Sequence, residues 1–327
     1  MTGFFRKYFN KLYYQKWIIG ISDENLSDII RNRKFDPDIN WLFRNSNNKI
    51  YGDPFFIRSK DGKIEIIMEV LQFEGDYGRL ALLTLDEKFR IGKLKILLDT
   101  KSHLSYPFVY MENGRYFIFP ESSKNGRLSC YEYDPVAERL MFLQDVLEYP
   151  LLDSTIIKKN GTYYIFGALT DDNVGYEEHV FYSDNLLGPY KGHPANPVKR
   201  GLDGTRSAGS FIEVDGTLYR PTQNCQKDYG DSITIYEMTE LNEKRVAEEP
   251  YMNIEINRRN KHNNGMFKIH TINYMNDLIV VDGKNWTFSP FCQLVNYLRK
   301  KNLINPIVFK INSEVGRQSG EQKNKTF

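Results

Sequence analysis

Short apolar runs alternate with polar positions along this chain, and one phrase recurs five times: an apolar run, a two-residue turn, then an aromatic-rich run. An Asn-Gly or Asp-Gly dipeptide between two such runs predicts a tight β-hairpin, because both central residues of that turn take positive φ. The turn returns about every 50 residues, which indicates a repeat architecture. The five turn dipeptides are Asp61-Gly62, Asn113-Gly114, Asn160-Gly161, Asp215-Gly216 and Asn276-Asp277.

A repeat of this length with four strands predicts a β-propeller, since a four-stranded blade buries both of its faces only against neighbouring blades. We therefore expect an all-β fold, a five-bladed β-propeller over residues 15–285. The fifth repeat is short of strands, and the apolar segment 17–22 is expected to pair into it. This N-terminal strand would close the last blade and leave no open sheet edge.

The C-terminal region departs from the strand pattern. Residues 289–301 show helical spacing behind a Ser-Pro start, so we expect a helix and a strand packed on the propeller within 286–311. Residues 312–327 have too little apolar content to fold and are expected to be disordered. The apolar face of the expected helix carries Phe291, Leu294, Val295 and Leu298.

Composition contributes mainly by exclusion. Lys and Arg total 44 against 42 for Asp and Glu, a net charge of +2, so no overall field attracts nucleic acid. No apolar run reaches the roughly 20 residues of a membrane-spanning helix, and no phosphate-binding loop follows a strand. The basic, aromatic segment 1–14 lacks a signal-peptide pattern. We expect it to form a short helix on the outer rim, with peripheral membrane contact as the alternative.

The positions of the cysteines and histidines indicate neither disulfide bonds nor a metal site. Cys130, Cys225 and Cys292 lie far apart, and the five histidines show no metal-ligand spacing. We expect reduced thiols in a cytoplasmic protein, no bound transition metal and no cofactor.

Polar residues occupy the entry points of the predicted inner strands. The inner strands of a propeller line its central channel, so residues at equivalent points converge on one funnel. Burying a charge without a partner costs several kcal/mol, so an axis filled only by packing would not contain these residues. They therefore predict a polar, water-filled site. They are Asp53, Tyr106, Asp153, Arg206 with Ser207, and His270.

A second ring of polar residues follows each turn. Glu121 stands out, because Phe119 and Pro120 would dry its carboxyl and raise its pKa toward the range of a general acid. The other members of this ring are Glu69, Gln223-Asn224 and Asp282-Gly283.

Each candidate also has a structural alternative. Asp53 before Pro54 is a common turn former, and Asp153 would serve as a cap at a strand start. In the structural alternative, Arg206 neutralises the two aspartates without binding a ligand, and Glu121 only pairs with an axial arginine. His270 is then a hydrogen-bonded axial residue without a functional role.

Several longer phrases resemble the five-bladed carbohydrate-active propellers, the superfamily that includes glycoside hydrolase families 43, 32 and 130. The likeness is greater to the N-terminal domain of plant glucosamine inositolphosphorylceramide transferase and its bacterial relatives in surface-polysaccharide gene sets. It covers about residues 15 to 285. The phrases include Gly52-Asp53-Pro54-Phe55, Pro120-Glu121-Ser122, Leu152-Asp153-Ser154, Arg206-Ser207-Ala208-Gly209, and His270-Thr271 with Val281-Asp282-Gly283.

The resemblance implies roles for individual residues. In the hydrolases a blade-one aspartate is base or nucleophile and a blade-three aspartate orients or tunes, which Asp53 and Asp153 match. The blade-four glutamate that donates the proton has no counterpart, because Arg206-Ser207-Ala208-Gly209 holds no carboxylate. Glu121 would substitute as the acid, with Tyr106, Arg206, Ser207, His270 and Asp282 binding substrate.

Three functions follow from these residues and their resemblance. The first is an enzyme of surface-polysaccharide synthesis that hydrolyses or transfers at a glycosidic bond, working in the cytoplasm at the inner membrane face. The second is a non-catalytic module that binds a glycan or sugar nucleotide for a partner glycosyltransferase. The third is a scaffold for protein contacts, which would not need acids on the axis.

Overall fold

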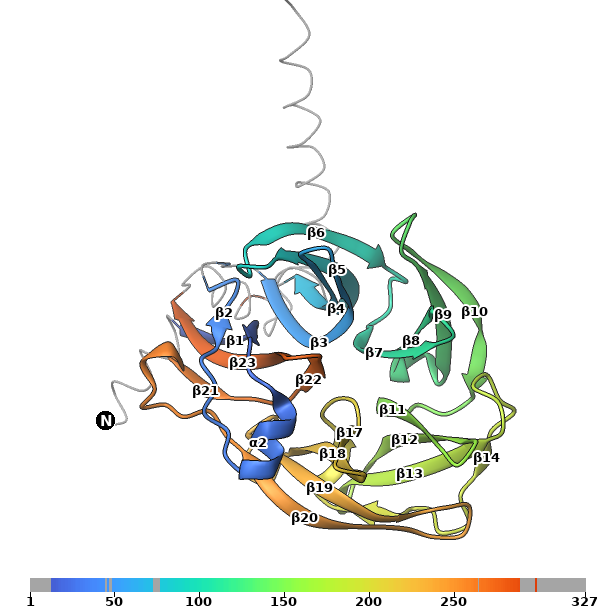
Figure 1. Ribbon diagram of the computed structural model, residues 1–327. Helices are drawn as coiled ribbons and strands as arrows, with labels where there is room; N and C mark the ends of the chain where they lie inside the picture. Colours follow the sequence, from blue (N-terminus) through green and yellow to red (C-terminus); the bar gives the residue numbers. More distant parts are fainter. Residues whose placement is uncertain are drawn as a thin grey trace, which may run out of the picture.

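Five antiparallel sheets surround a common axis in the computed structural model, which describes residues 13–44, 46, 49–72, 77–263, 265–288 and 298 (Figure 1). Each sheet is one blade, and the chain visits the blades in order, except that its first two strands belong to the last blade. The predicted five-bladed propeller is thereby confirmed.

The first three blades follow the predicted repeat closely: the inner strand lies nearest the axis, with three strands outside it in blades 1 and 2 and four in blade 3. Blade 3 ends in two short strands that both pair with β13. Blade 1 holds β3 (Lys49–Lys60), β4 (Lys63–Gln72), β5 (Gly78–Asp86) and β6 (Ile91–Leu98); blade 2 holds β7 (Ser105–Glu112), β8 (Arg115–Glu121), β9 (Leu128–Asp134) and β10 (Arg139–Leu147); blade 3 holds β11 (Leu152–Lys159), β12 (Thr162–Asp171), β13 (Gly175–Ser183), β14 (Lys191–Gly192) and β15 (Lys199–Arg200).

The inner strands of blades 4 and 5 are each split in two near the axis, and both halves pair with the same second strand. Blade 4 holds β16 (Asp203–Ser207), β17 (Ile212–Val214), β18 (Thr217–Asn224), β19 (Ser232–Leu241) and β20 (Val246–Ile254); blade 5 holds β21 (Met266–Lys268), β22 (Ile272–Met275), β23 (Leu278–Phe288), β1 (Tyr13–Ser22) and β2 (Asn40–Trp41).

The predicted hairpin turns join the expected strands in all five blades. The first turn residue is Asn or Asp in each case, and these side chains tolerate left-handed backbone better than most. The φ values are 53° at Asp61, 51° at Asn113, 52° at Asn160, 52° at Asp215 and 53° at Asn276.

The N-terminal strand closes the ring. β1 pairs with β23 over its full length, from Tyr13 opposite Phe288 to Ser22 opposite Ile279. Ile18, Ile19 and Ile21 on this strand are fully buried. The predicted closure by segment 17–22 is therefore confirmed.

The apolar core is divided among the seams between blades. One cluster joins blades 1, 2 and 3, a second joins blades 5 and 1, and others fill the seams on either side of blade 4. Because each blade buries its faces against its neighbours, the blades hold a fixed spacing around the axis.

The helices differ from expectation. The sequence did not predict α2 (Leu26–Asn32), which is too short to show two periods of apolar spacing; Asn25 caps it by accepting hydrogen bonds from Ser27 N and Asp28 N. Of the helix expected over 289–301, only Leu298 is among the described residues, and it is helical. Two single 3₁₀ turns are η1 (Ser123–Asn125) and η2 (Lys261–Asn263).

None of the helices that the structure describes is long and apolar enough to cross a membrane. Cys130 and Cys225 are buried free thiols, as predicted, and Cys292 lies outside the described residues.

Candidate active site

The inner strands of blades 1, 2 and 3 break their regular pairing at the same point. Asp53, Tyr106 and Asp153 have φ of 50°, 40° and 47°, and the ladder to the next strand is irregular beside each of them. Holding a residue other than glycine in this region costs of order 1–3 kcal/mol and is typical of functional sites. The irregularity turns the backbone so that polar side chains of an otherwise apolar strand reach the axis.

A cavity of about 250 Å³ opens at this end of the axis. Its wall brings together five of the residues predicted from the sequence, which come from five different strands or strand ends. They are Asp53, Glu121, Asp153, Arg206 and His270.

Three other predicted residues lie off this wall. Tyr106 is fully buried beneath it, and its hydroxyl bonds Thr155 Oγ1 at 2.9 Å. Ser207 is buried, with its carbonyl accepting a bond from Gln223. Asp282 is fully buried and reaches the cavity only through His270 and Asp53. Their side chains support the wall, so the predicted direct contacts of all three with substrate have no support in this geometry.

Carboxylates of one blade bind the backbone of the next blade at the axis. Asp282 Oδ2 accepts the N–H of Asp53 at 3.0 Å, and Asp53 Oδ2 accepts the N–H of Tyr106 at 3.1 Å. Glu121 Oε2 accepts the N–H of Asp153 at 3.2 Å. These bonds satisfy the N–H groups of the irregular positions and fix the carboxylates with them.

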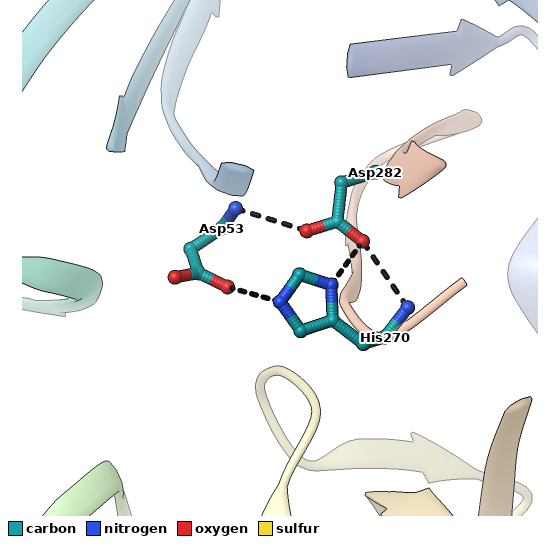
Figure 2. A group of neighbouring side chains, drawn as sticks. All are labelled: Asp53, His270 and Asp282. Carbon is teal, nitrogen blue, oxygen red and sulfur yellow. Dashed lines mark hydrogen bonds and ion pairs between the residues drawn. The ribbon is translucent and has the colours of Figure 1, made fainter. Parts of the chain in front are cut away.

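His270 lies between two aspartates, as Figure 2 shows. Its Nδ1 lies 2.7 Å from Asp282 Oδ1 and its Nε2 lies 3.4 Å from Asp53 Oδ1. Burial would lower the pKa of His270, but the attraction of Asp282 and Asp53 outweighs it and raises the pKa. Burial raises the pKa of Asp53 to about 6, against the attraction of His270.

Asp53, His270 and Asp282 each offer an atom within 4.8 Å of the others, a geometry that a metal ion could use. Both aspartates already accept backbone N–H bonds, and Asp282 bonds His270 Nδ1. These donors already bond the carboxylate oxygens, so hydrogen bonds hold the cluster together.

Asp153 is held from blade 4. Arg206 Nε donates to Asp153 Oδ2 at 2.6 Å and Gln223 Nε2 donates to the same oxygen at 2.8 Å. Arg206 was expected to neutralise the axial aspartates, and it pairs with Asp153.

Glu121 ends β8 with its carboxyl buried. Burial is the main cause that raises its pKa to about 8, and the nearby charge of Asp153 adds to it, while Arg206 opposes it. Its oxygens accept bonds from Ser123 Oγ at 3.0 Å and Asp153 N at 3.2 Å. Within the described residues, Arg206 forms its ion pair with Asp153 rather than with Glu121.

Sequence reasoning missed three chemistry-bearing residues of the wall: Trp17, His103 and Tyr229. The Tyr229 ring lies 6.2 Å from the Trp17 ring and 5.3 Å from the His270 ring, and the Arg206 guanidinium lies 5.2 Å from its centre. Tyr229 lies on the loop between β18 and β19, outside the strands that the repeat defines. Glu69 was noted in the second ring but given no role.

Comparison with known proteins shows the family of this chain. Residues 48–283 match the family model described as "Glucosamine inositolphosphorylceramide transferase 1, N-terminal". The chain is 32% identical over 211 residues to glucosamine inositolphosphorylceramide transferase 1 of Arabidopsis thaliana, covering 61% of this chain and 27% of that protein. The japonica rice protein of the same name is 30% identical over 200 residues, covering 60% and 26%. The match thus spans about a quarter of the length of these plant relatives.

Among solved structures, Zg3597, a family 117 glycoside hydrolase from Zobellia galactanivorans, is similar in fold. It aligns with a TM-score of 0.53 at 13% identity, covering 86% of this chain and 94% of that one. This likeness supports the propeller fold.

Proposed function

Because this chain belongs to the glucosamine inositolphosphorylceramide transferase 1 N-terminal family, we propose that its axial cavity binds a sugar and acts on the glycosidic bond of that sugar, by transfer or hydrolysis. One observation carries the proposal: carboxyl groups with separated proton affinities line one cavity. The pKa of Asp53 is about 6 and that of Glu121 about 8, so near pH 7 one is ionised and the other protonated. Glycoside chemistry needs such a pair.

Asp53 supplies the base or nucleophile in this proposal. Tyr106 N and Thr271 Oγ1 donate to its two oxygens, which fixes the carboxylate, and His270 Nε2 lies 3.4 Å from Oδ1. Asp153, held by Arg206, orients the hydroxyl groups of the sugar. A glutamic acid of the wall supplies the proton; Glu121 is the residue predicted from the sequence for this role.

The mouth of the cavity suits a sugar. The rings of Trp17 and Tyr229 form part of the wall beside the carboxylates, and a wall that combines apolar rings with a few polar groups is typical of a small-ligand site. A space of about 250 Å³ fits one sugar ring rather than a chain of them. In its more specific form, the proposal is that the protein takes part in the synthesis of surface polysaccharides.

The alternative is a sugar-binding module without turnover that serves a transferase. The hydrogen bonding of the acidic side chains favours this alternative, because both oxygens of Asp53 and both of Glu121 already accept hydrogen bonds from the protein. The short share of the plant relatives that this chain matches also fits a module of a larger system.

The test is incubation of the protein with a panel of nucleotide sugars and aryl glycosides, with products followed by mass spectrometry. We expect turnover of at least one compound, and a loss of about 10²–10⁴-fold in Asp53→Asn because the base is removed. Glu249→Gln, an exposed carboxylate on β20, is the matched control and should keep full activity. Equal turnover in Asp53→Asn would refute catalysis at this site, and saturable sugar binding without turnover would support the alternative.

A further inference from the structure

Glu69 on β4 differs from the other carboxyl groups of the cavity in its bonding. Within the part of the chain that the structure describes, neither of its oxygens accepts a hydrogen bond, and His103 Nε2 lies 3.8 Å from Oε1. Its side chain is 14% exposed, on the cavity wall. A carboxyl group that is nearly buried and keeps its oxygens free has capacity to bond a ligand.

The other three carboxyl groups of the wall are already engaged. Asp53 accepts from Tyr106 N and Thr271 Oγ1, and Glu121 accepts from Ser123 Oγ and Asp153 N. Asp153 Oδ2 accepts from both Arg206 and Gln223. Glu121 would have to give up a bond that supports the backbone of blade 3 in order to reach a ligand.

Gly78 leaves the space that the Glu69 carboxyl occupies, whereas Gly52 lies only within van der Waals range of it. A Cβ added at Gly78 would lie 2.2 Å from Glu69 Oε1, and one added at Gly52 would lie 3.6 Å from Oε2. Gly78 is therefore a position where no larger residue fits while Glu69 keeps this conformation.

His103 presents a defined nitrogen to Glu69. Its Nδ1 accepts the N–H of Gly78 at 2.9 Å, so the proton of the neutral ring is on Nε2, the nitrogen that faces Glu69. Burial lowers the pKa of His103, and Lys124 adds to this effect, which keeps the ring neutral. Nε2–H can thus donate to a Glu69 carboxylate as soon as that group ionises and moves closer.

We propose that Glu69, with His103 beside it, is the carboxyl group that gives its proton to the ligand in the cavity, and so fills the role of general acid in place of Glu121. The inference rests on the proposed function. In the reaction, the O–H bond of Glu69 breaks and its proton goes to the glycosidic oxygen as the bond from that oxygen to the anomeric carbon breaks. In the inverting form, the oxygen of the attacking hydroxyl bonds to the anomeric carbon and its proton goes to Asp53. Asp53 then releases this proton to water and Glu69 takes one up, which restores both groups.

The charges around Glu69 suit an acid that holds its proton near neutral pH. The groups that face it are Asp53 from β3, Glu121 from β8, Asp153 from β11, Asp282 from β23, and His103 before β7. Burial, followed by the repulsion of these carboxylates, raises the pKa of Glu69 well above its usual range. His103 assists by stabilising the ionised form after the proton has left.

A labelling experiment tests the free carboxyl without any need for turnover. A water-soluble carbodiimide and glycinamide at pH 6 to 7 modify protonated, accessible carboxyl groups, and peptide mass spectrometry locates the product. We expect Glu69 to react at least about tenfold faster than Glu121, because its oxygens have no competing donors. Faster or equal labelling of Glu121 would overturn the proposal.

The neighbouring histidine gives a second readout. His103→Asn keeps an acceptor for Gly78 N–H but removes Nε2, so the fold should be unchanged while labelling of Glu69 persists to higher pH, since its carboxylate has lost a donor. An unchanged pH dependence would exclude the role of His103 as a positioning residue.

Kinetics separates this inference from the proposed function. With a compound turned over by the wild type, Glu69→Gln should lose about 10²–10⁴-fold on a leaving group that needs protonation and far less on a dinitrophenolate, which leaves without it. Equal losses on both, or this pattern in Glu121→Gln instead, would overturn the role of Glu69 and leave the proposed function intact. Full activity of Asp53→Asn, or no turnover in the wild type, would instead remove the proposed function, and the role of Glu69 as acid with it.

Discussion

Arg206 Nε donates to Asp153 Oδ2 over 2.6 Å, and the two side chains are 11% and 4% exposed. This pair ties the inner strand of blade 4 to that of blade 3 at the cavity. Because both charges are nearly removed from water, each depends on the other for compensation.

Removal of the arginine should therefore be costly. We expect Arg206→Met to lower the free energy of unfolding by roughly 3–5 kcal/mol, since it leaves Asp153 charged and buried. Urea denaturation measures it, and adding Asp153→Asn should recover part of the loss. Arg31→Met, at an exposed ion pair with Asp28 and Asp215, is the control and should change little. Similar losses in both arginine variants would contradict the prediction.

Activity should depend on pH with two limbs. Below about pH 6, Asp53 takes up a proton and the base is lost; above neutrality, the acid glutamate of the wall loses the proton it must donate. We expect a bell-shaped profile of kcat/KM whose limbs belong to the coupled group of carboxyls. A profile flat from pH 5 to 9 would show that these carboxyls take no part in proton transfer.

Stability should respond to Glu121 in the opposite sense to an ordinary surface acid. Its pKa is about 8 in the folded protein against an ordinary 4.5, so the folded state holds a proton that the unfolded state releases. Stability contributed by this group is present below pH 4.5 and is lost as the pH rises to 8. Glu121→Gln should thus match the wild type at pH 5 and exceed it at pH 8.5, by at most roughly 5 kcal/mol at about 1.4 kcal/mol per pKa unit. Thermal melts at both pH values decide this, and lower stability of the variant at pH 8.5 would contradict it.

Deletion of residues 1–24 should unfold the propeller, because it removes β1, buries nothing in its place and exposes the edge of β23. Deletion of residues 1–12 is the matched control, since it leaves β1 whole, and it should retain the melting temperature. Circular dichroism of both proteins gives the answer. A cooperative melt at the wild-type temperature after the longer deletion would disprove closure by β1.

Gly78→Ala should be far more disruptive than Gly92→Ala. The added Cβ at Gly78 would lie 2.2 Å from Glu69 Oε1 and 2.4 Å from Leu104 O, whereas at Gly92 the nearest atom is 3.4 Å away. We expect a lowered melting temperature for Gly78→Ala and a displaced Glu69, visible as a changed rate of carbodiimide labelling. If both variants melt and label alike, the space around Glu69 is looser than this packing requires.

The repeat made the fold and half of the site predictable. Five turn dipeptides of one type defined the blades, and the shortage of strands in the last blade indicated that 17–22 would fill it. Equivalent register also placed Asp53 and Asp153 at the axis. By contrast α2 has too few residues for a period, and its cap at Asn25 gives only a weak signal in a sequence.

Side-chain direction was not predictable by the same means. Asp53 and Tyr106 hold equivalent positions with similar φ, yet the first lies on the cavity wall and the second is buried beneath it. Where the ladder is irregular, a shift of one residue changes the face that a side chain reaches, so register fixes the position of the Cα and leaves its direction open. Tyr229 came from an irregular loop, where no repeat register applies.

The pairing of β1 with β23 also sets the order of events during synthesis. Tyr13–Ser22 is made before the other described strands of the propeller, yet its partner Leu278–Phe288 is made after them. Blades 1 to 4 can each form from local hairpins as they appear, while β1 waits unpaired. The ring is therefore completed only after translation has passed β23, by the most distant contact in the fold, and that contact is expected to be the slow step in its assembly.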